Sequence, residues 1–214
     1  STPLNYSLVV ILILVFFFLF QIQDSSWLTS YFLAFRKISL LCFILASFFL
    51  VNFIVKKNGL STDNGYPIFF YLLFILFFPG IFNNLNVLYA NFFVLLAIRR
   101  LISLQSLKAS KEKIFDASFW ILIAALFQFW SILFIILVYI SIIFHVSRDY
   151  RNWVLPFIAL LGVSSLFLMV SLIFKFDAVT FIQDRAVIDF RIDYFKDNYE
   201  NGALSIYVAV ALFF

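Results

Sequence analysis

The sequence predicts an all-α fold, a polytopic bundle of about eight transmembrane helices forming a single domain over residues 1–214. Of its 214 residues, 65% are hydrophobic and 12% are charged, whereas a soluble domain averages about 45–50% apolar and about 25% charged residues. Seven long apolar runs make up nearly all of the chain, and short polar patches separate them. Because about 20 apolar residues cross the hydrocarbon layer as a helix, we expect membrane spans joined by short loops.

The apolar runs give the expected helices in chain order, and polar residues mark where each one ends. Asp24 follows the first run, Lys56 and Lys57 close the second, and Arg99 and Arg100 close the fourth. Such polar residues and turn-forming Asn and Gly are typical of the connections between helices. The runs lie at residues 4–22, 38–55, 66–82, 87–98, 115–146, 153–174 and 203–214.

The run at residues 115–146 is expected to cross the membrane twice. A single helix of that length would be about 48 Å long, too long for the bilayer without severe tilt. Gln128 and Trp130 lie where a tight hairpin would meet the far interface. The last run, at residues 203–214, would reach only about 18 Å as a helix, so we expect it to be an incomplete eighth span.

The positions of Lys and Arg predict the orientation of the bundle. With a cytoplasmic N-terminus and a hairpin at Gln128, the inner loops contain nine Lys and Arg residues and the outer loops six. This arrangement obeys the positive-inside rule, whereas a single crossing of residues 115–146 would place Arg148 and Arg151 outside. The basic residues sit beside the ends of apolar runs, so the expected partner is the lipid bilayer and not a nucleic acid.

A basic patch on the inner face follows the fourth run. It either anchors the topology or binds anionic lipid headgroups or a cytoplasmic partner. Its members are Arg99, Arg100, Lys108, Lys111 and Lys113.

Uncharged polar residues within the runs are the expected contacts between helices. Asn52, Asn91 and Gln128 are costly in hydrocarbon, so each is expected to form a hydrogen bond to another helix. Small residues form further packing faces, among them Ala117, Ser118 and Ala124, and a second stripe that begins at Ala159. The chain has one histidine and one cysteine and no motif of a soluble enzyme, so no metal site and no cofactor are expected.

The outer segment at residues 175–201 alternates aromatic and aliphatic residues with charged ones. This pattern is typical of an amphipathic helix lying on the membrane surface. The segment is expected to be a surface-bound connector, or else a lid or docking surface that contacts a lipid phosphate or a partner. The charged residues that would make those contacts are Asp184, Arg185, Asp189 and Arg191.

Three stretches in the middle of the chain, about residues 57–174, resemble a family of multi-spanning bacterial membrane proteins without an assigned activity. The stretches are Ala90-Asn91 followed by residues 98–104, then residues 113–120, then residues 148–153 with Pro156. The resemblance implies a bacterial inner-membrane protein and supports the hairpin at Gln128. Because the family members are longer, it also implies that this chain lacks a C-terminal part.

Two classes of function, and a third held in reserve, fit these features. The first is a non-enzymatic integral subunit or accessory protein of a bacterial cell-envelope complex, with membrane-protein partners. The alternative is a multi-spanning lipid-linked sugar transferase (GT-C-like), a class similar to this chain in span number. Asp24, in the first outer loop, would be its catalytic acid or base. The third is a transporter.

Overall fold

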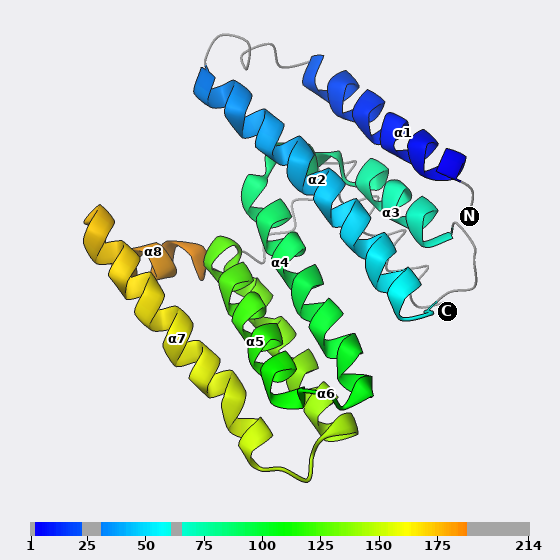
Figure 1. The fold of residues 1–214 in the computed structure, drawn as a ribbon. Helices are drawn as coiled ribbons and strands as arrows, with labels where there is room; N and C mark the ends of the chain where they lie inside the picture. The colour runs from blue at the N-terminus through cyan, green and yellow to red at the C-terminus, as the bar shows by residue number, and fades with distance from the viewer. Residues whose placement is uncertain (1–2, 23–30, 61–65, 188–214) are drawn as a thin grey trace.

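The computed structural model describes residues 3–22, 31–60 and 66–187, and this part of the chain is helical without a strand (Figure 1). The eight α-helices are α1 (Pro3–Ile22), α2 (Tyr31–Lys57), α3 (Tyr66–Phe77), α4 (Leu85–Ile102), α5 (Ser110–Phe127), α6 (Ile135–His145), α7 (Arg151–Phe174) and α8 (Ala178–Arg185). Three short 3-10 helices connect them: η2 (Pro79–Asn83), η3 (Ser103–Ser106) and η4 (Phe129–Phe134).

Three of the described helices are long and apolar enough to cross a membrane: α2, α4 with its extension to Ser106, and α7. The all-α class is thereby confirmed, but the structure does not support a count of about eight spans. The shorter apolar helices are Tyr6–Ile22, Pro67–Phe77 and Phe129–His145. The expected span at residues 203–214 lies outside the described residues.

Local sequence explains why several apolar runs fall short of a full span. The third run breaks at Pro79, where a 3-10 turn replaces the α-helix, because proline has no N–H to donate to the preceding turn. The first turns of α5 carry Lys111, Glu112 and Lys113, with Asp116 one turn later, so only the later part of α5 is apolar. The six residues of η4 leave α6 only 11 residues long.

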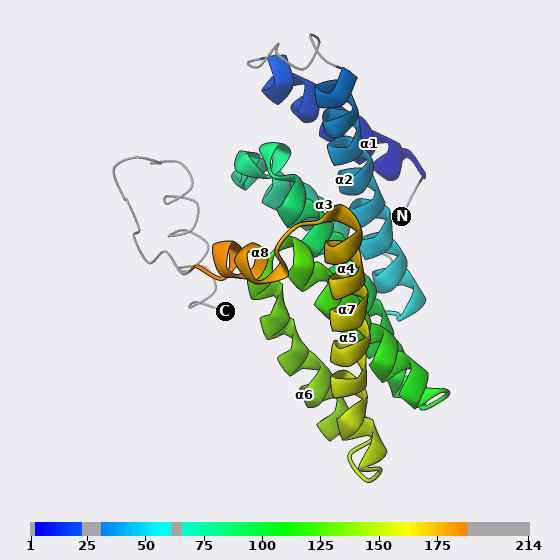
Figure 2. The ribbon, with the colours of Figure 1, turned by 90° about the vertical axis from the view of Figure 1, so that its left-hand side faces the viewer.

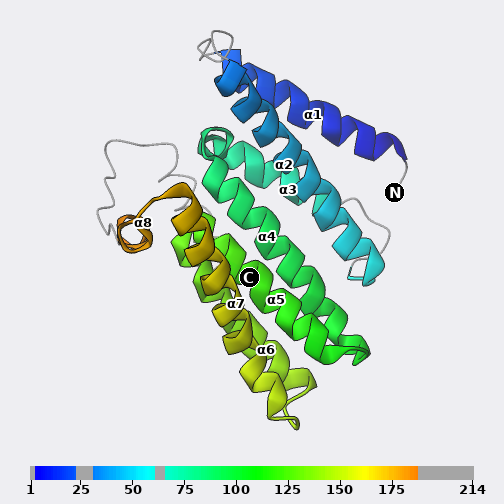
Figure 3. The ribbon, with the colours of Figure 1, turned by 60° about the vertical axis from the view of Figure 1, so that its left-hand side comes forward.

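Consecutive long helices alternate in direction. The start of α1 meets the end of α2, where Tyr6 donates a hydrogen bond to Asn52. The end of α4 meets the start of α5, where Arg100 pairs with Asp116. Helices α2 and α4 consequently run the same way along the bundle, as do α5 and α7 (Figures 1 and 3). The ends of α2, α4 and α6 therefore lie at the same end of the molecule as the starts of α5 and α7.

The chain reverses within residues 115–146, as the length argument predicts. Helix α5 ends at Phe127, and Gln128 adopts an extended backbone (φ −131°, ψ 105°) that stops the helix. The returning helix packs back on the first: Ile114 and Ile121 of α5 share a buried cluster with Ile142 of α6.

Two kinds of packing hold the bundle together. The first unit, α1–α3, is filled by large residues, among them Ile13, Ile44 and Phe48. Small residues mediate the contacts of α5 instead, because Ala117 and Ala124 are fully buried against their neighbours. Small side chains let helix backbones approach closely, which strengthens van der Waals packing where lipid offers no hydrophobic driving force.

Candidate functional site

Positive charge collects at one end of the bundle, which we call the basic end. Among the described residues, this end carries nine Lys and Arg against three acids, Glu112, Asp116 and Asp149. The opposite end carries four Lys and Arg against two acids, Asp177 and Asp184. The nine cations of the basic end are Lys56, Lys57, Arg99, Arg100, Lys108, Lys111, Lys113, Arg148 and Arg151.

The turn between α4 and α5 is held by its own polar groups. Leu107 and Ala109 adopt left-handed backbone conformations, with φ of 54° and 51°, which reverse the chain in a few residues. The Nζ atom of Lys113 donates to the Ser103 carbonyl oxygen at 2.6 Å and contacts the Ser106 hydroxyl at 2.7 Å. A cation at the carbonyl end of a helix also interacts favourably with the helix dipole. Lys113 is therefore part of the turn's structure.

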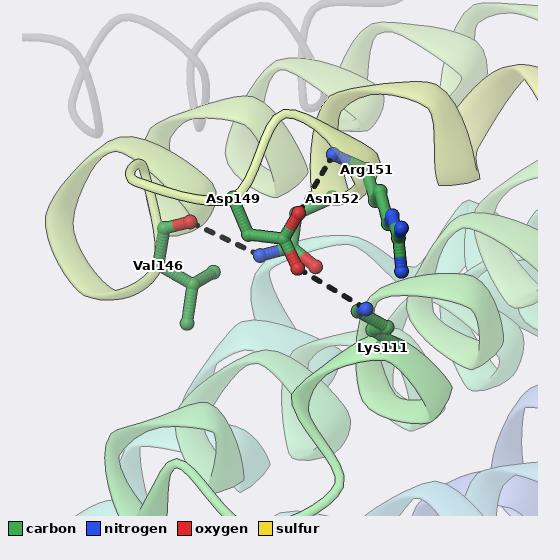
Figure 4. A network of polar contacts seen from close by, with 5 residues as sticks. All are labelled: Lys111, Val146, Asp149, Arg151 and Asn152. Atoms are coloured by element: carbon green, nitrogen blue, oxygen red, sulfur yellow. Dashed lines mark hydrogen bonds and ion pairs between the residues drawn. The ribbon is translucent and has the colours of Figure 1, made fainter.

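An ion pair joins that turn to the next one, between α6 and α7. Lys111 Nζ lies 3.1 Å from Asp149 Oδ2, and the Arg151 backbone N–H donates to Asp149 Oδ1 at 3.1 Å (Figure 4). Asn152 Nδ2 donates to the Val146 carbonyl oxygen at 3.0 Å within the same turn (Figure 4). The Arg151 N–H first, and Lys111 second, lower the pKa of the Asp149 carboxyl below its ordinary value, because both stabilise the charged form.

The other cations of the basic end divide into engaged and unengaged groups. The Arg99 guanidinium lies 4.7 Å from the ring centroid of Phe53, and Lys57 Nζ lies 5.3 Å from the same ring. Lys108 and Arg148 are exposed, and no described group forms a hydrogen bond or ion pair with either. The basic patch of the sequence is therefore partly structural and partly free to contact something outside the chain.

At the opposite end, Arg185 has a role that the sequence did not predict. Its Nη1 atom donates to the carbonyl oxygens of Leu126 and Phe127, at 2.5 and 3.5 Å. The guanidinium also stacks 4.0 Å from the ring centroid of Phe181. The last carbonyls of a helix have no partner within the helix, so Arg185 completes the end of α5. The expected contact with a lipid phosphate is replaced by this internal one.

Helix α8 leaves α7 at a steep angle and lies across the end of the bundle (Figures 2 and 3). Phe167 of α7 packs against Phe176 and Phe181, with ring centroids 5.9 and 5.4 Å away. Asp184 is exposed on α8. The other charged residues expected to form a site at this end, Asp24, Asp189 and Arg191, lie outside the described residues.

The three uncharged polar residues expected between helices have three different environments. Asn52 accepts the hydrogen bond from Tyr6, 3.1 Å long, and so links α2 to α1. Gln128 is exposed at the end of α5, because the chain turns there instead of continuing through the membrane. Asn91 is exposed on α4, with no hydrogen-bond partner among the described residues.

Sequence reasoning missed several buried polar groups. Gln21, at the end of α1, is 2% exposed, and both atoms of its amide lack a partner in the described structure. Ser47 and Asn152 are also buried. Each lies at the edge of an apolar run or within it, where a polar residue is the signal that could have identified it.

Within the described ranges, no group of three His, Cys, Asp or Glu side chains is placed to hold a metal ion. Compared with known protein families, curated proteins and solved structures, the chain matches none of them.

Proposed function

We propose that this chain is a multi-pass membrane protein that acts as a non-enzymatic subunit or accessory protein of a bacterial cell-envelope complex. The observation that supports the proposal best is the exposure of Asn91 on α4, one of the three helices long and apolar enough to cross a membrane.

Asn91 lies in the middle of an apolar stretch of α4, between Ala90 and Phe92. A carboxamide without a hydrogen-bond partner in hydrocarbon costs several kcal/mol, of the order of 4–8 in an alkane-like medium. Polar side chains in transmembrane helices accordingly bond across to a neighbouring helix. The exposed face of α4 around Asn91 is therefore suited to receive a helix of another protein.

The proposed orientation places the basic end in the cytoplasm and α8 on the outer surface. The excess of cations at the basic end supports this orientation, because cytoplasmic loops carry more Lys and Arg. In the full proposal the bundle has about eight spans, including residues 203–214, and lies in the inner membrane. That location draws on the resemblance of the middle of the chain to bacterial inner-membrane proteins.

Photo-crosslinking in cells tests the proposed partner. With p-benzoylphenylalanine at position 91, we expect a covalent product with a second protein. The same probe at Leu161 provides the matched control, because Leu161 lies on α7 and is 72% exposed on a face without an unpaired polar residue. The control is expected to give no protein product.

A second arm compares Asn91→Leu with Asn91→Gln. If a carboxamide holds the partner, Asn91→Leu dissociates the complex on a native gel and Asn91→Gln retains it. A crosslink from position 91 to residues 203–214 of the same chain would contradict the proposal, as would a monomer that gives no product at all.

A further inference from the structure

We propose that the two turns at the basic end, α4–α5 and α6–α7, together bind the headgroup of an anionic phospholipid, with Lys108 and Arg148 as the contacting cations. This inference rests on the membrane placement proposed above and does not require a partner protein.

The division of the cations into engaged and unengaged groups is the first support. Arg100 and Lys111 are paired with Asp116 and Asp149, at 2.9 and 3.1 Å, and Lys113 is bonded to its own turn. Lys108 and Arg148 have no such partner among the described residues, although each lies in one of the two turns that the Lys111–Asp149 pair joins (Figure 4). The unbalanced charge of this end is therefore concentrated on a small, defined surface.

The second support is that both turns are held in place before any ligand arrives. The Leu107 N–H donates to the Leu104 carbonyl oxygen at 2.9 Å, next to Lys108. The Asn152 N–H donates to the Asp149 carbonyl oxygen at 3.0 Å, next to Arg148. A ligand that binds preorganised groups does not have to order the backbone, and its affinity rises accordingly.

The third support is the apolar surface beside the two cations. Leu107, Phe144 and Tyr150 are 59%, 78% and 73% exposed, and all three lie in the turns or in the last turn of α6. An aqueous partner such as an acidic peptide would leave much of this apolar surface in water. A phospholipid matches both features, because its phosphate meets the cations while the adjoining acyl region covers the aromatic and aliphatic side chains.

Native mass spectrometry of the full chain in a neutral detergent tests the inference, with phosphatidylglycerol and phosphatidylcholine as probes. The wild type should bind phosphatidylglycerol more tightly than phosphatidylcholine. The double variant Lys108→Gln/Arg148→Gln should bind phosphatidylglycerol about tenfold to thirtyfold more weakly, because each cation near an anionic headgroup contributes about a fivefold factor. Its binding of phosphatidylcholine should not change.

A charge-matched control is available at the opposite end. Arg36 and Lys175 are exposed, so Arg36→Gln/Lys175→Gln removes the same net charge and should change phosphatidylglycerol binding less than twofold. The exchange Lys108→Arg/Arg148→Lys should retain binding. The single variant Lys108→Gln should lose about fivefold, which provides a second measurement should the double variant fold poorly.

Three results would overturn the inference: unchanged phosphatidylglycerol binding in the double variant, an equal loss in the control pair, or loss of a bound acidic protein while lipid binding persists. These outcomes are separate from the crosslinking at Asn91. Lipid binding can therefore fail while the proposed partner is still captured, and the reverse also holds.

Discussion

The two ends of the bundle use positive charge in opposite ways. At the outer end, the guanidinium of Arg185 is turned inward, where it completes the last carbonyls of α5 and stacks on Phe181. At the basic end, Lys113 has a similar internal role, but Lys108 and Arg148 remain unengaged. The same residue types therefore stabilise the fold at one end, and at the other they also leave charge available to an external ligand.

The comparison shows that charge alone does not identify a binding residue. Arg185 and Arg148 are both arginines close to a helix end. What separates them is whether the fold already supplies acceptors: two carbonyl oxygens for Arg185, and none for Arg148 among the described residues. Substitution at each end should therefore have different consequences for stability and for binding.

Arg185→Ala should have the largest effect on stability. It removes a charged donor from the end of α5 and the stacking partner of Phe181, so we expect the free energy of unfolding to fall by about 2 kcal/mol. Hydrogen exchange should also increase in α8. Thermal unfolding in detergent measures the first effect, and Arg36→Ala, an exposed cation at the same end, should change it by less than about 0.5 kcal/mol. Equal effects of the two variants would contradict an internal role for Arg185.

Lys113→Ala should have the next largest effect, of about 1 kcal/mol, because it leaves the Ser103 carbonyl and the Ser106 hydroxyl without their donor. The matched variant is Lys108→Ala, in the same turn, which should leave the free energy of unfolding unchanged. Should Lys108→Ala destabilise the protein as much as Lys113→Ala, the distinction between engaged and free cations would be wrong.

Arg100→Gln should have a smaller effect. Its ion pair with Asp116 is well formed at 2.9 Å, but the two side chains are 46% and 35% exposed. Half-exposed pairs of this kind contribute about 0.2–1 kcal/mol. A double-mutant cycle with Asp116→Asn measures the coupling directly, and a coupling energy above about 2 kcal/mol would show that the pair is more shielded than the structure indicates.

The smallest effect should come from the pH dependence of the link between the two turns. The pKa of Asp149 is lowered in the folded protein, so its contribution is fully present above the unfolded-state pKa of about 3.9 and is lost as pH falls through the lower folded-state value. Phosphatidylglycerol binding should therefore be constant between pH 7 and about 5, as far as Asp149 is concerned. In Asp149→Asn, binding should be weaker at every pH in that range. A midpoint near pH 6 that depends on Asp149 would contradict the assigned contacts.

Much of the helical architecture could be predicted from the sequence because it depends on local properties. Run length and the charges of Arg148 and Arg151 were enough to predict the reversal at Gln128, and the small residues Ala117 and Ala124 indicated close packing. The number of full spans could not be predicted in the same way. A 3-10 turn at Pro79 and the charged start of α5 shorten helices that hydropathy alone counts as complete.

The roles of individual polar residues were harder to predict because their partners are distant in the chain. Arg185 bonds to the Leu126 carbonyl, 59 positions away, and Tyr6 bonds to Asn52, 46 positions away. The sequence contains the donors but does not show which carbonyl ends or amides face them. For the same reason, an unpaired position such as Asn91 becomes informative only once its neighbours are in place.

The central claim is that the bundle is polarised across a membrane, with the basic end in the cytoplasm and α8 outside. Labelling of intact cells with a membrane-impermeant maleimide tests it most directly, with single cysteines at Lys108→Cys and Gln183→Cys in a Cys42→Ser background. We predict that Gln183→Cys is labelled in intact cells, and that Lys108→Cys is labelled only after the membrane is permeabilised. Labelling of both positions in intact cells, or of Lys108→Cys alone, would contradict the account.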